Sequence, residues 1–435
     1  MNIAVIGTGY VGLVTGVCLS DLGHNVTCID IDEKKVEKLN NGKSPIYEEG
    51  LEELLEKNLR QERLTFTTDY TRGLAQKQLV YIAVGTPQGD DGSADLTYVN
   101  AACRDIASHL ENDAVIVTKS TVPVGTNEHI KETIEANLVN DVSISVASNP
   151  EFLRQGSAVH DTFRGDRIVI GSNDEEALEL LEKVNAGFRL PIVKTDLRSA
   201  EMIKYASNAF LATKISFINE MANLSEKIGA NIDHVAKGMG MDKRIGESFL
   251  NAGIGFGGSC FPKDTRAIIS IGRNVENDMP ILENVVDVNE RQRSIIVDKL
   301  HKRVTDLSNK KVAVLGLSFK PNTDDMREAP SIDVTEKLLD KNAEVVAYDP
   351  VATENAKEVL SNKVHYATSI EKAVQDADVA IILTEWKEIK NFPLHEYKAR
   401  MKEALVFDGR NCFTLDQVKN SGVEYHSIGR PVIYG

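Results

Sequence analysis

The chain has 435 residues, of which 42% are hydrophobic, and it carries 50 Lys and Arg against 65 Asp and Glu, a formal net charge of −15. A chain of this length is expected to form two or three domains with more than one hydrophobic core. The excess of acidic residues excludes a general nucleic-acid-binding or anionic-membrane surface, because either would require a basic face. Any anionic ligand must therefore be held by a local cluster of donors.

The cysteines and the first residues of the chain bear on its compartment. Five cysteines occur without a CxxC or metal-ligand spacing, at Cys18, Cys28, Cys103, Cys260 and Cys412. This usage predicts a reducing cytosol, no disulfide framework and no metal. The first residues lack the basic flank and apolar core of a signal peptide, and no apolar run is long enough to cross a bilayer. We expect a cytoplasmic protein.

The N-terminal stretch has the pattern strand, glycine turn, helix. Residues 3–6 form a short apolar run, and residues 7–12 read Gly-Thr-Gly-Tyr-Val-Gly before a helical pattern. Such a turn places a pyrophosphate against backbone N–H groups at a helix N-terminus. The next strand, residues 25–29, ends on Asp30, at the spacing of an acid that binds the ribose hydroxyls. Since a carboxylate there repels the extra phosphate of NADP, we predict NAD as the cofactor, with Lys35 near its adenosine end; the alternative is a glycine turn without a ligand.

Three further strand-like runs end in polar loops. They cover residues 79–84, 114–118 and 143–147. In an open parallel sheet the ligand crevice lies beyond the carboxyl ends of the strands, so these loops are expected to converge. The candidates they supply are Thr86, Thr118, Thr121 and Glu151. Each single threonine has the alternative of a cap or turn residue. Residues 168–170 read as one more strand closing the first domain, and residues 194–196 as a boundary loop.

Residues 197–228 read as one long helix, because they contain apolar positions at helical spacing and no glycine or proline before Gly229. Such a helix can join two domains and carry a dimer interface. Lys204 and Asn208 lie four apart on it and share a face, where a cation and an amide can hold an oxyanion and a water. The alternative is a solvent-facing lysine near Glu201.

A glycine-rich bend, residues 255–264, reads Gly-Phe-Gly-Gly-Ser-Cys-Phe-Pro-Lys-Asp and follows a second helical stretch at residues 232–239. Its glycines allow close approach to another molecule, which a structural cysteine does not need. Lys263 favours a thiolate at Cys260, and the carboxylate of Asp264 can orient water. The bend therefore predicts a nucleophile, against the alternative of a buried cysteine in a tight turn.

The last third of the chain repeats the α/β layout after a helical segment at residues 279–300. Its predicted strands are residues 311–315, 344–348, 379–383 and 405–407, with a helix at residues 331–339. The glycine triplet is missing, since only Gly316 remains, whereas Lys320, Arg327 and Arg410 supply cations. This favours a different phosphorylated ligand, bound by side chains, over scattered surface charges. The fold predicted is α/β, with two Rossmann-like doubly wound domains at residues 1–196 and 301–435, joined by a helical region with the long central helix and the cysteine loop at residues 197–300.

Together these parts suggest a reaction. Hydride transfer from an alcohol gives an aldehyde, a thiolate adds to it, a second hydride transfer gives a thioester, and water releases an acid. The glycine turn, residues 119–123 and 149–153, the helix with Lys204 and Asn208, and above all residues 255–264 resemble the UDP-glucose 6-dehydrogenase family of nucleotide-sugar dehydrogenases, over nearly the whole chain. The resemblance implies oxidation of UDP-glucose to UDP-glucuronate with two NAD, and a homodimer formed about the long helix.

The resemblance also implies residue roles. The nucleophile is Cys260, and the other catalytic positions are Lys204, Asn208, Asp264, Thr118 and Glu151. The cofactor positions are Gly7, Gly9, Tyr10, Val11, Gly12, Asp30, Lys35, Thr86, Thr121, Gln155, Lys263 and Arg327. The substrate positions are Glu151, Phe152, Leu153, Arg154, Gln155, Lys204, Asn208, Arg244, Phe249, Leu250, Asn251, Ala252, Gly253, Gly257, Lys320 and Arg410, with Arg244 reaching a neighbouring subunit's ligand.

One position departs from the family pattern, and several readings stay open. Where the family has Arg-Glu-Gly, this chain has Arg154-Gln155-Gly156, which keeps hydrogen-bonding geometry but loses a charge. GDP-mannose and N-acetylated UDP-sugars are equivalent to UDP-glucose at C6. A two-electron dehydrogenase with a structural Cys260, and a non-catalytic sensor of NAD or nucleotide sugars, are the remaining alternatives.

Overall fold

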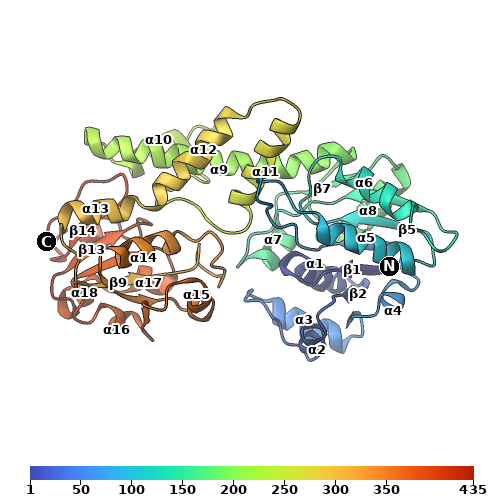
Figure 1. Ribbon diagram of the computed structural model, residues 1–435, viewed down its shortest axis with the longest axis horizontal. Helices are drawn as coiled ribbons and strands as arrows, with labels where there is room; N and C mark the ends of the chain where they lie inside the picture. Colours follow the sequence, from blue (N-terminus) through green and yellow to red (C-terminus); the bar gives the residue numbers. More distant parts are fainter. The chain divides into compact units, whose positions relative to one another are not determined.

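The computed structural model describes residues 1–435 and divides into two compact units, Met1–Ser207 and Asn208–Gly435. Each unit contains one open sheet with helices packed against it (Figure 1). The predicted α/β class, with two Rossmann-like doubly wound domains and a long central helix, is confirmed. No helix is both long and apolar enough to cross a lipid bilayer.

The sheet of the first unit has eight strands in the order β3-β2-β1-β4-β5-β6-β7-β8. The strands are β1 (Asn2–Ile6), β2 (Asn25–Ile29), β3 (Leu64–Thr67), β4 (Leu79–Ile82), β5 (Ala114–Thr118), β6 (Ile144–Ser148), β7 (Ile168–Gly171) and β8 (Ile192–Thr195). The helices are α1 (Tyr10–Asp21), α2 (Glu33–Asn40), α3 (Leu51–Arg60), α4 (Tyr70–Leu74), α5 (Thr97–His109), α6 (Thr126–Glu135), α7 (Ala158–Arg164) and α8 (Glu175–Asn185). All neighbouring strands pair in parallel except β6 and β7, which are antiparallel.

The strands of this sheet are apolar at consecutive positions because both faces are covered. Ile3 and Val5 of β1 belong to one buried cluster, whereas Ala4 and Ile6 belong to another. Successive side chains of a strand point to opposite faces, so each cluster fills one side of the sheet. The carboxyl ends of β1, β4 and β5 are thereby held at one edge by two cores.

The prediction of a boundary loop at residues 194–196 is wrong, since Lys194 and Thr195 lie in β8. The strand is half exposed at the edge of the sheet and pairs only with β7. An edge strand needs no continuous apolar run, so its sequence resembles a loop. The strand expected at residues 168–170 is β7, but β8 rather than β7 ends the sheet.

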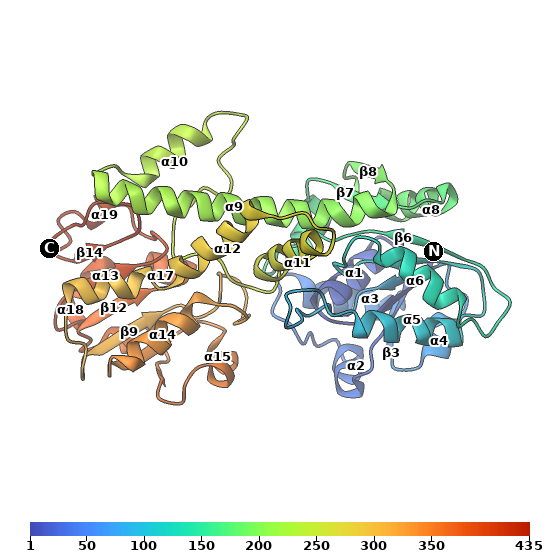
Figure 2. The same ribbon diagram turned by 45° about the horizontal axis from the view of Figure 1, so that its top comes forward.

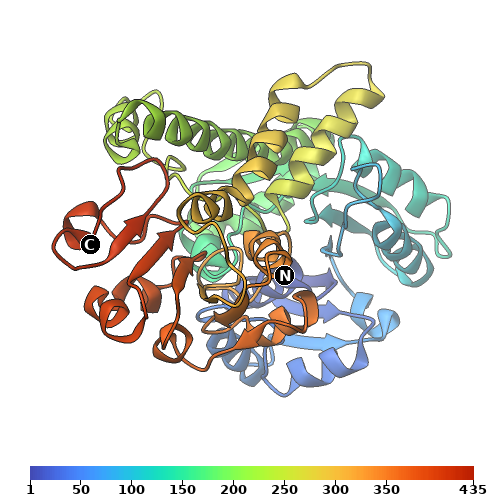
Figure 3. The ribbon, with the colours of Figure 1, turned by 60° about the vertical axis from the view of Figure 1, so that its left-hand side comes forward.

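The sheet of the second unit, drawn in orange to red in Figure 3, belongs to the C-terminal part of the chain. It has six parallel strands in the order β11-β10-β9-β12-β13-β14. The strands are β9 (Lys311–Leu315), β10 (Glu344–Tyr348), β11 (His365–Tyr366), β12 (Val379–Ile382), β13 (Leu405–Asp408) and β14 (Glu424–His426). The helices that pack with it are α14 (Pro330–Asp340), α15 (Thr353–Val359), α16 (Ile370–Val374), α17 (Lys387–Asn391), α18 (Leu394–Arg400) and α19 (Leu415–Val418).

The helix α9 (Leu197–Ile228) begins in the first unit and continues into the second, with the bounds predicted from the sequence (Figure 2). The second unit also contains α10 (Ile232–Gly240), α11 (Phe261–Asn274), α12 (Pro280–Arg293) and α13 (Ile295–Arg303). The helical segment expected at residues 279–300 is two helices, because the chain breaks at Ser294, which ends α12 and begins α13.

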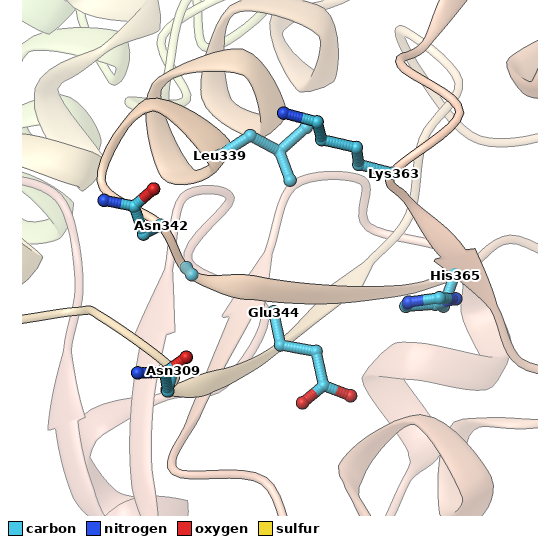
Figure 4. Close-up of a pocket in the computed structure, with 7 residues that line it drawn as sticks. Asn309, Leu339, Asn342, Glu344, Lys363 and His365 are labelled. Carbon is cyan, nitrogen blue, oxygen red and sulfur yellow. The ribbon is translucent and has the colours of Figure 1, made fainter.

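A shallow polar pocket lies at the amino ends of the second sheet's strands (Figure 4). Its lining includes Glu344 and His365, the first residues of β10 and β11, together with Lys363. Ligands of open parallel sheets bind at the opposite, carboxyl ends of the strands. We therefore place the functional site of this sheet elsewhere.

Candidate active site

The glycine turn between β1 and α1 fits a pyrophosphate. Gly7 has φ +94°, and a Cβ there would lie 2.7 Å from the carbonyl oxygen of Ala83. A Cβ on Gly12 would lie 2.0 Å from the Gly7 oxygen, so the turn packs directly against the helix. Gly9, the N-cap of α1, has no side-chain cap and no atom within 4 Å of its missing Cβ. The helix N-terminus is thus uncapped and approachable, as an anionic phosphate group requires.

Asp30 follows β2, as predicted, and its carboxylate closes the side of this turn. One oxygen, Oδ2, accepts from Thr8 N (2.8 Å), Thr8 Oγ1 (2.5 Å) and Lys35 Nζ (3.1 Å). Burial raises the pKa of Asp30, but these donors and the Asp32 N–H outweigh burial and hold the pKa below its usual value. The carboxylate is therefore ionised near neutral pH, the form that accepts hydrogen bonds from ribose hydroxyls.

The predicted threonines lie at the carboxyl ends of two neighbouring strands. Thr86 follows β4 and donates through Oγ1 to the carbonyl oxygen of Thr121, 2.9 Å away. Thr118 ends β5 and is buried. The first unit thus brings together the glycine turn and these threonines along one edge of its sheet, as the parallel pairing of β1, β4 and β5 requires.

Residues 151–156 run beside the glycine turn. Glu48, a buried carboxylate that the sequence did not single out, accepts from the Tyr10 hydroxyl and from the backbone N–H groups of Gly156 and Ala158, both 2.7 Å away. This carboxylate ties the 155–158 loop to the first turn of α1. The Oε1 atom of Gln155 is buried without a hydrogen-bond partner, so this amide can accept a further donor.

A buried ion pair joins Glu151 to Lys204 of α9. Lys204 Nζ lies 3.0 Å from Glu151 Oε1, and the two side chains are 4% and 6% exposed. The other carboxylate oxygen accepts from Leu153 N at 2.6 Å. The alternative of a solvent-facing lysine near Glu201 is thus wrong, because both Glu201 and Lys204 are buried. The pair supplies a cation and a carboxylate in a low-dielectric environment, where each acts strongly on a developing charge.

Lys119, in the predicted loop at residues 119–123, is a second lysine of this cluster, and the sequence assigned it no role. Its Nζ donates to Asn149 Oδ1 at 3.2 Å. Burial, together with the charge of Lys204, lowers the pKa of Lys119 to about 8, although Glu151 acts in the opposite direction. Two lysines and one carboxylate therefore share the carboxyl ends of β5 and β6.

In the second unit, Cys260 is the N-cap of α11 and is half-buried. The positive end of a helix dipole stabilises a negative charge on sulfur. Arg327 is a second positive group that interacts with this thiol. The hydrogen bond to Asp325 is the main cause that raises the pKa of its guanidinium, and the charge of Cys260 raises that pKa further. By contrast, burial raises the pKa of Cys18, Cys28 and Cys103 to about 12, so these thiols stay protonated.

Asp264, one turn after the thiol, holds two of the predicted residues. Its Oδ2 accepts from Asn208 Nδ2 at 2.6 Å, and its Oδ1 accepts from Lys263 Nζ at 2.6 Å. Asp264 is 1% exposed, and Asn208 is 6% exposed. The carboxylate therefore fixes the Asn208 amide with its oxygen directed away from Asp264, ready to accept from a substrate hydroxyl or a water.

The loop before Cys260 is clamped by side chains of two helices. Asn219 of α9 accepts from Gly253 N at 2.8 Å. Asn289 of α12 accepts from Phe256 N (2.8 Å) and donates to Phe256 O (3.0 Å), and Gln292 donates to Gly253 O (2.7 Å). These buried amides satisfy the backbone groups of a loop that has no regular structure, so they fix its path.

Arg410, predicted to bind substrate, also contacts this loop. Its guanidinium donates to Gly255 O at 2.8 Å and to Leu383 O at 2.9 Å. A Cβ on Gly257 would lie 2.0 Å from Glu328 O, so that position admits only glycine. The phosphate-binding candidates and the thiol loop are therefore parts of one packed region of the second unit.

The remaining predicted residues lie in three settings. Arg244 is exposed and pairs with Asp242, and Arg327 pairs with Asp325. Arg154 pairs with Asp161 at the surface, while the Phe152 ring lies beneath Arg167, 3.7 Å from its guanidinium carbon. The other substrate positions belong to the backbone run before the thiol or to the loop after β9, and they are Phe249, Leu250, Asn251, Ala252, Gly253 and Lys320.

Sequence profiles of the UDP-glucose/GDP-mannose dehydrogenase family match the chain in three parts. Its NAD-binding domain matches residues 1–189, its central domain residues 198–291, and its UDP-binding domain residues 313–415. These matches follow the chain order of the first sheet, the helical region and the second sheet.

Individual relatives resemble the chain over its whole length. It is 58% identical over 433 residues to UDP-glucose 6-dehydrogenase YwqF of Bacillus subtilis, covering 100% of this chain and 98% of that protein, and 47% identical to UDP-glucose 6-dehydrogenase of Rhizobium meliloti, covering 99% and 100%. Among solved structures, a UDP-glucose dehydrogenase from Pyrobaculum islandicum aligns with a TM-score of 0.92 at 40% identity, covering 99% of this chain and 98% of that one. A UDP-D-ManNAc dehydrogenase from Pyrococcus horikoshii aligns with a TM-score of 0.87 at 29% identity, covering 99% of each.

Proposed function

Because the chain belongs to the UDP-glucose/GDP-mannose dehydrogenase family, we propose that it oxidises UDP-glucose to UDP-glucuronate in two successive NAD-dependent steps. The observation that carries the proposal is a thiol at the N-terminus of α11, in a chain whose first sheet bears an uncapped, approachable helix N-terminus. A one-step alcohol dehydrogenase has no need of a nucleophilic cysteine. A thiolate becomes necessary when the aldehyde must be captured before a second oxidation.

NAD, when bound at the glycine turn, accepts a hydride from the substrate carbon in each oxidation. Gly7, Gly9 and Gly12 leave room for its pyrophosphate, and Asp30 accepts from its ribose hydroxyls. Thr86, Thr121, Lys263 and Arg327 complete the cofactor positions, and the buried Gln155 Oε1 offers an acceptor to a donor of the cofactor or the substrate.

The remaining steps belong to the side chains. In the first oxidation C6 loses a hydride and its hydroxyl proton, and Lys204 stabilises the negative charge that develops on that oxygen. Cys260 Sγ adds to the aldehyde carbon to form a thiohemiacetal, and loss of a second hydride and the hydroxyl proton leaves a thioester. Water then attacks the thioester, releasing the carboxylate and the thiol. Asn208 and Asp264 position the reacting oxygens and the water, and Thr118 and Glu151 take part in the water and proton transfers.

Substrate recognition is assigned to two stretches of the chain and two cations. Glu151 to Gln155 and residues 249–253 line the sugar and nucleotide, and Lys320 and Arg410 neutralise the diphosphate. The supporting observation is the packing of Arg410 against the thiol loop, which joins the diphosphate-binding region to the nucleophile. The assignment follows a three-domain division at residues 1–196, 197–300 and 301–435.

The active form is a homodimer through α9. Phe210, Phe217 and Leu224 are spaced seven residues apart and are 65%, 45% and 48% exposed, so they form an apolar stripe on one face of the helix. A second copy of the same stripe is self-complementary across a twofold axis. Arg244, exposed in the loop after α10, then reaches the partner's ligand. Because the thiol must remain reduced, the enzyme acts in the cytoplasm.

The test is product stoichiometry with purified protein. With UDP-glucose limiting and NAD in excess, the protein must yield two NADH per sugar. The Cys260→Ala variant must form no UDP-glucuronate. One NADH per sugar, unchanged by Cys260→Ala, indicates a two-electron dehydrogenase with a structural cysteine, and binding without any NADH indicates a sensor. GDP-mannose and UDP-N-acetylhexosamines, assayed in parallel, decide the sugar: a higher kcat/KM for either overturns the assignment to UDP-glucose.

A further inference from the structure

Glu201 of α9 is a buried carboxylate that the reaction proposed above does not use. It is 3% exposed, and the three hydrogen bonds to its oxygens come from N–H groups. Oε2 accepts from Gly125 N at 2.6 Å, and Oε1 accepts from Asn127 N at 2.9 Å and from Asn127 Nδ2 at 2.7 Å. Each of these contacts is a donor aimed at an oxygen of Glu201, so both oxygens act as hydrogen-bond acceptors.

The position of this carboxylate explains how the charge is tolerated. Gly125 is the N-cap of α6 and has no side chain to cap the helix. Glu201 therefore takes the place of a capping side chain and faces the positive end of the helix dipole. Burial raises the pKa of Glu201 by more than the three N–H donors lower it, so the pKa lies above its usual value.

The carboxylate fixes the orientation of the Asn127 amide. An oxygen of Glu201 lies 2.7 Å from Asn127 Nδ2, and the reversed amide would place two acceptor oxygens at that distance. With Nδ2 toward Glu201, Asn127 Oδ1 faces Thr118 Oγ1, 2.7 Å away. Thr118 must then be the donor, because Oδ1 has no hydrogen to give.

The direction of this hydrogen bond decides whether Thr118 can donate to a ligand or accept from it. Its single proton is used on Asn127, and no backbone or side-chain donor contacts Oγ1. Thr118 and Asn127 are each 1% exposed, so the unpaired oxygen is a buried acceptor. A buried acceptor of this kind requires a donor from a bound water or a ligand.

We propose that Glu201 is a positioning residue which, through Asn127, makes Thr118 a hydrogen-bond acceptor for the water that hydrolyses the thioester. The inference rests on the proposed function, in which Thr118 assists that water. A water that donates a proton to Thr118 keeps both lone pairs and gains electron density on its oxygen, which makes it a better nucleophile for the thioester carbon. A water that accepts from Thr118 uses one lone pair and loses electron density, which makes it a poorer nucleophile. The direction of one hydroxyl thus controls the release step.

The experiment reverses the direction of the hydrogen bond between Thr118 and Asn127 and keeps both side chains in place. In Glu201→Gln, an amide oxygen in the place of Oε2 accepts from Gly125 N, and the NH2 in the place of Oε1 faces the Asn127 side chain. The hydrogen bond from Asn127 N is lost in this variant and equally in the double variant, so it does not affect the comparison between them. The Asn127 amide then turns, its NH2 donates to Thr118, and the Thr118 proton points at the water. Adding Asn127→Asp to Glu201→Gln restores an acceptor beside Thr118, because the carboxylate introduced at position 127 accepts both from the amide at position 201 and from the Thr118 hydroxyl.

The measurement separates hydrolysis from oxidation. Glu201→Gln is expected to form NADH in a first burst at the wild-type rate and then to turn over at least about tenfold more slowly, as expected for loss of assistance to one proton-transfer step. Intact-mass analysis should detect the sugar nucleotide on Cys260. The double variant should recover turnover and lose the adduct. Glu128→Gln is the matched control, since Glu128 lies on the first turn of α6 and pairs with Arg198 at the surface.

Turnover of Glu201→Gln equal to that of the wild type overturns the inference, as does equal slowing of the burst and the steady state without recovery in the double variant. If Glu201→Gln does not fold, the double variant decides: turnover near the wild type supports the inference, and a folded double variant as slow as Thr118→Val overturns it. The proposed function is judged separately, by the two NADH per sugar of the wild type.

Discussion

Replacement of Asn289 by alanine tests whether the clamp on the thiol loop is needed for catalysis. Asn289 is 4% exposed and binds both the N–H and the C=O of Phe256, at 2.8 and 3.0 Å. Each buried backbone group left without a partner costs about 1–3 kcal/mol, so the two together set a range of about 2–6 kcal/mol. Water that enters the vacated space satisfies part of this loss, and we expect the free energy of unfolding to fall by about 2–3 kcal/mol.

The effect on activity should exceed the effect on cofactor binding. A displacement of about 1 Å in a reacting group lowers the rate about a hundredfold, so kcat of Asn289→Ala should fall about tenfold to a hundredfold. NAD affinity should change less than kcat, because the glycine turn and Asp30 belong to the first sheet and only Lys263 and Arg327 of the proposed cofactor positions lie near the loop. Denaturant unfolding, steady-state NADH formation and the alkylation rate of Cys260 measure the three quantities. Asn284→Ala is the matched control on the same helix, since Asn284 is exposed and contacts only Pro280 O. An Asn289→Ala enzyme with wild-type kcat and alkylation rate would refute the argument.

Three further changes probe other parts of the proposal. Phe217→Glu places a carboxylate in the apolar stripe and should convert the proposed dimer to a monomer in sedimentation velocity, whereas Lys227→Glu, at an exposed position near the end of α9, should not. Asp30→Ala removes the acceptor for the ribose hydroxyls and should raise the NAD KM about tenfold while reducing discrimination against NADP; an unchanged ratio of the two KM values would contradict the assignment. Burial lowers the pKa of Lys119 to about 8 from 10.5, so between these values the unfolded chain binds a proton that the folded chain does not, and stability rises with pH across that window. Lys119→Met should remove this rise, measured as the difference in denaturant midpoint between the two proteins from about pH 8 to about pH 10; parallel curves would show that Lys119 is ordinarily ionised.

The bounds of helices and strands were predicted most accurately where an apolar run is followed directly by an aspartate or a glycine. The bounds of β2, β9, β10 and α9 agree with those expected, because Asp30, Gly316, Asp349 and Gly229 follow the apolar patterns directly. The edge strands β3, β8, β11 and β14 were not predicted. Each pairs with one neighbour or has an exposed face, so its residues need not be continuously apolar.

The site was predicted unevenly for a different reason. Cys260, Lys263 and Asp264 stand in one short motif, so their proximity follows from the chain. Asn219, Asn289 and Gln292 are single amides on helices, and a sequence does not distinguish a buried amide from a solvated one. Asn289 and Gln292 are three residues apart and therefore share a face, which was the available signal. Their partners are backbone groups of an irregular loop, and only the folded structure identifies those.

The two sheets show how one topology serves two kinds of ligand. Asp30 and Asp349 occupy equivalent places in the two sheets. Asp30 follows β2, which pairs with β1, and Asp349 follows β10, which pairs with β9. Asp349 accepts from Leu317 N, Ser318 N, Trp386 Nε1, Val351 N and Ala352 N, and is 4% exposed. Asp30 accepts from fewer protein donors, one of which is a lysine side chain able to move. The second carboxylate is fully committed to the protein, so it stabilises the turn after β9 in place of a dinucleotide ribose. The second sheet thus lacks both the glycine triplet and a carboxylate open to a ribose, which agrees with the proposal that Lys320 and Arg410 bind the ligand there.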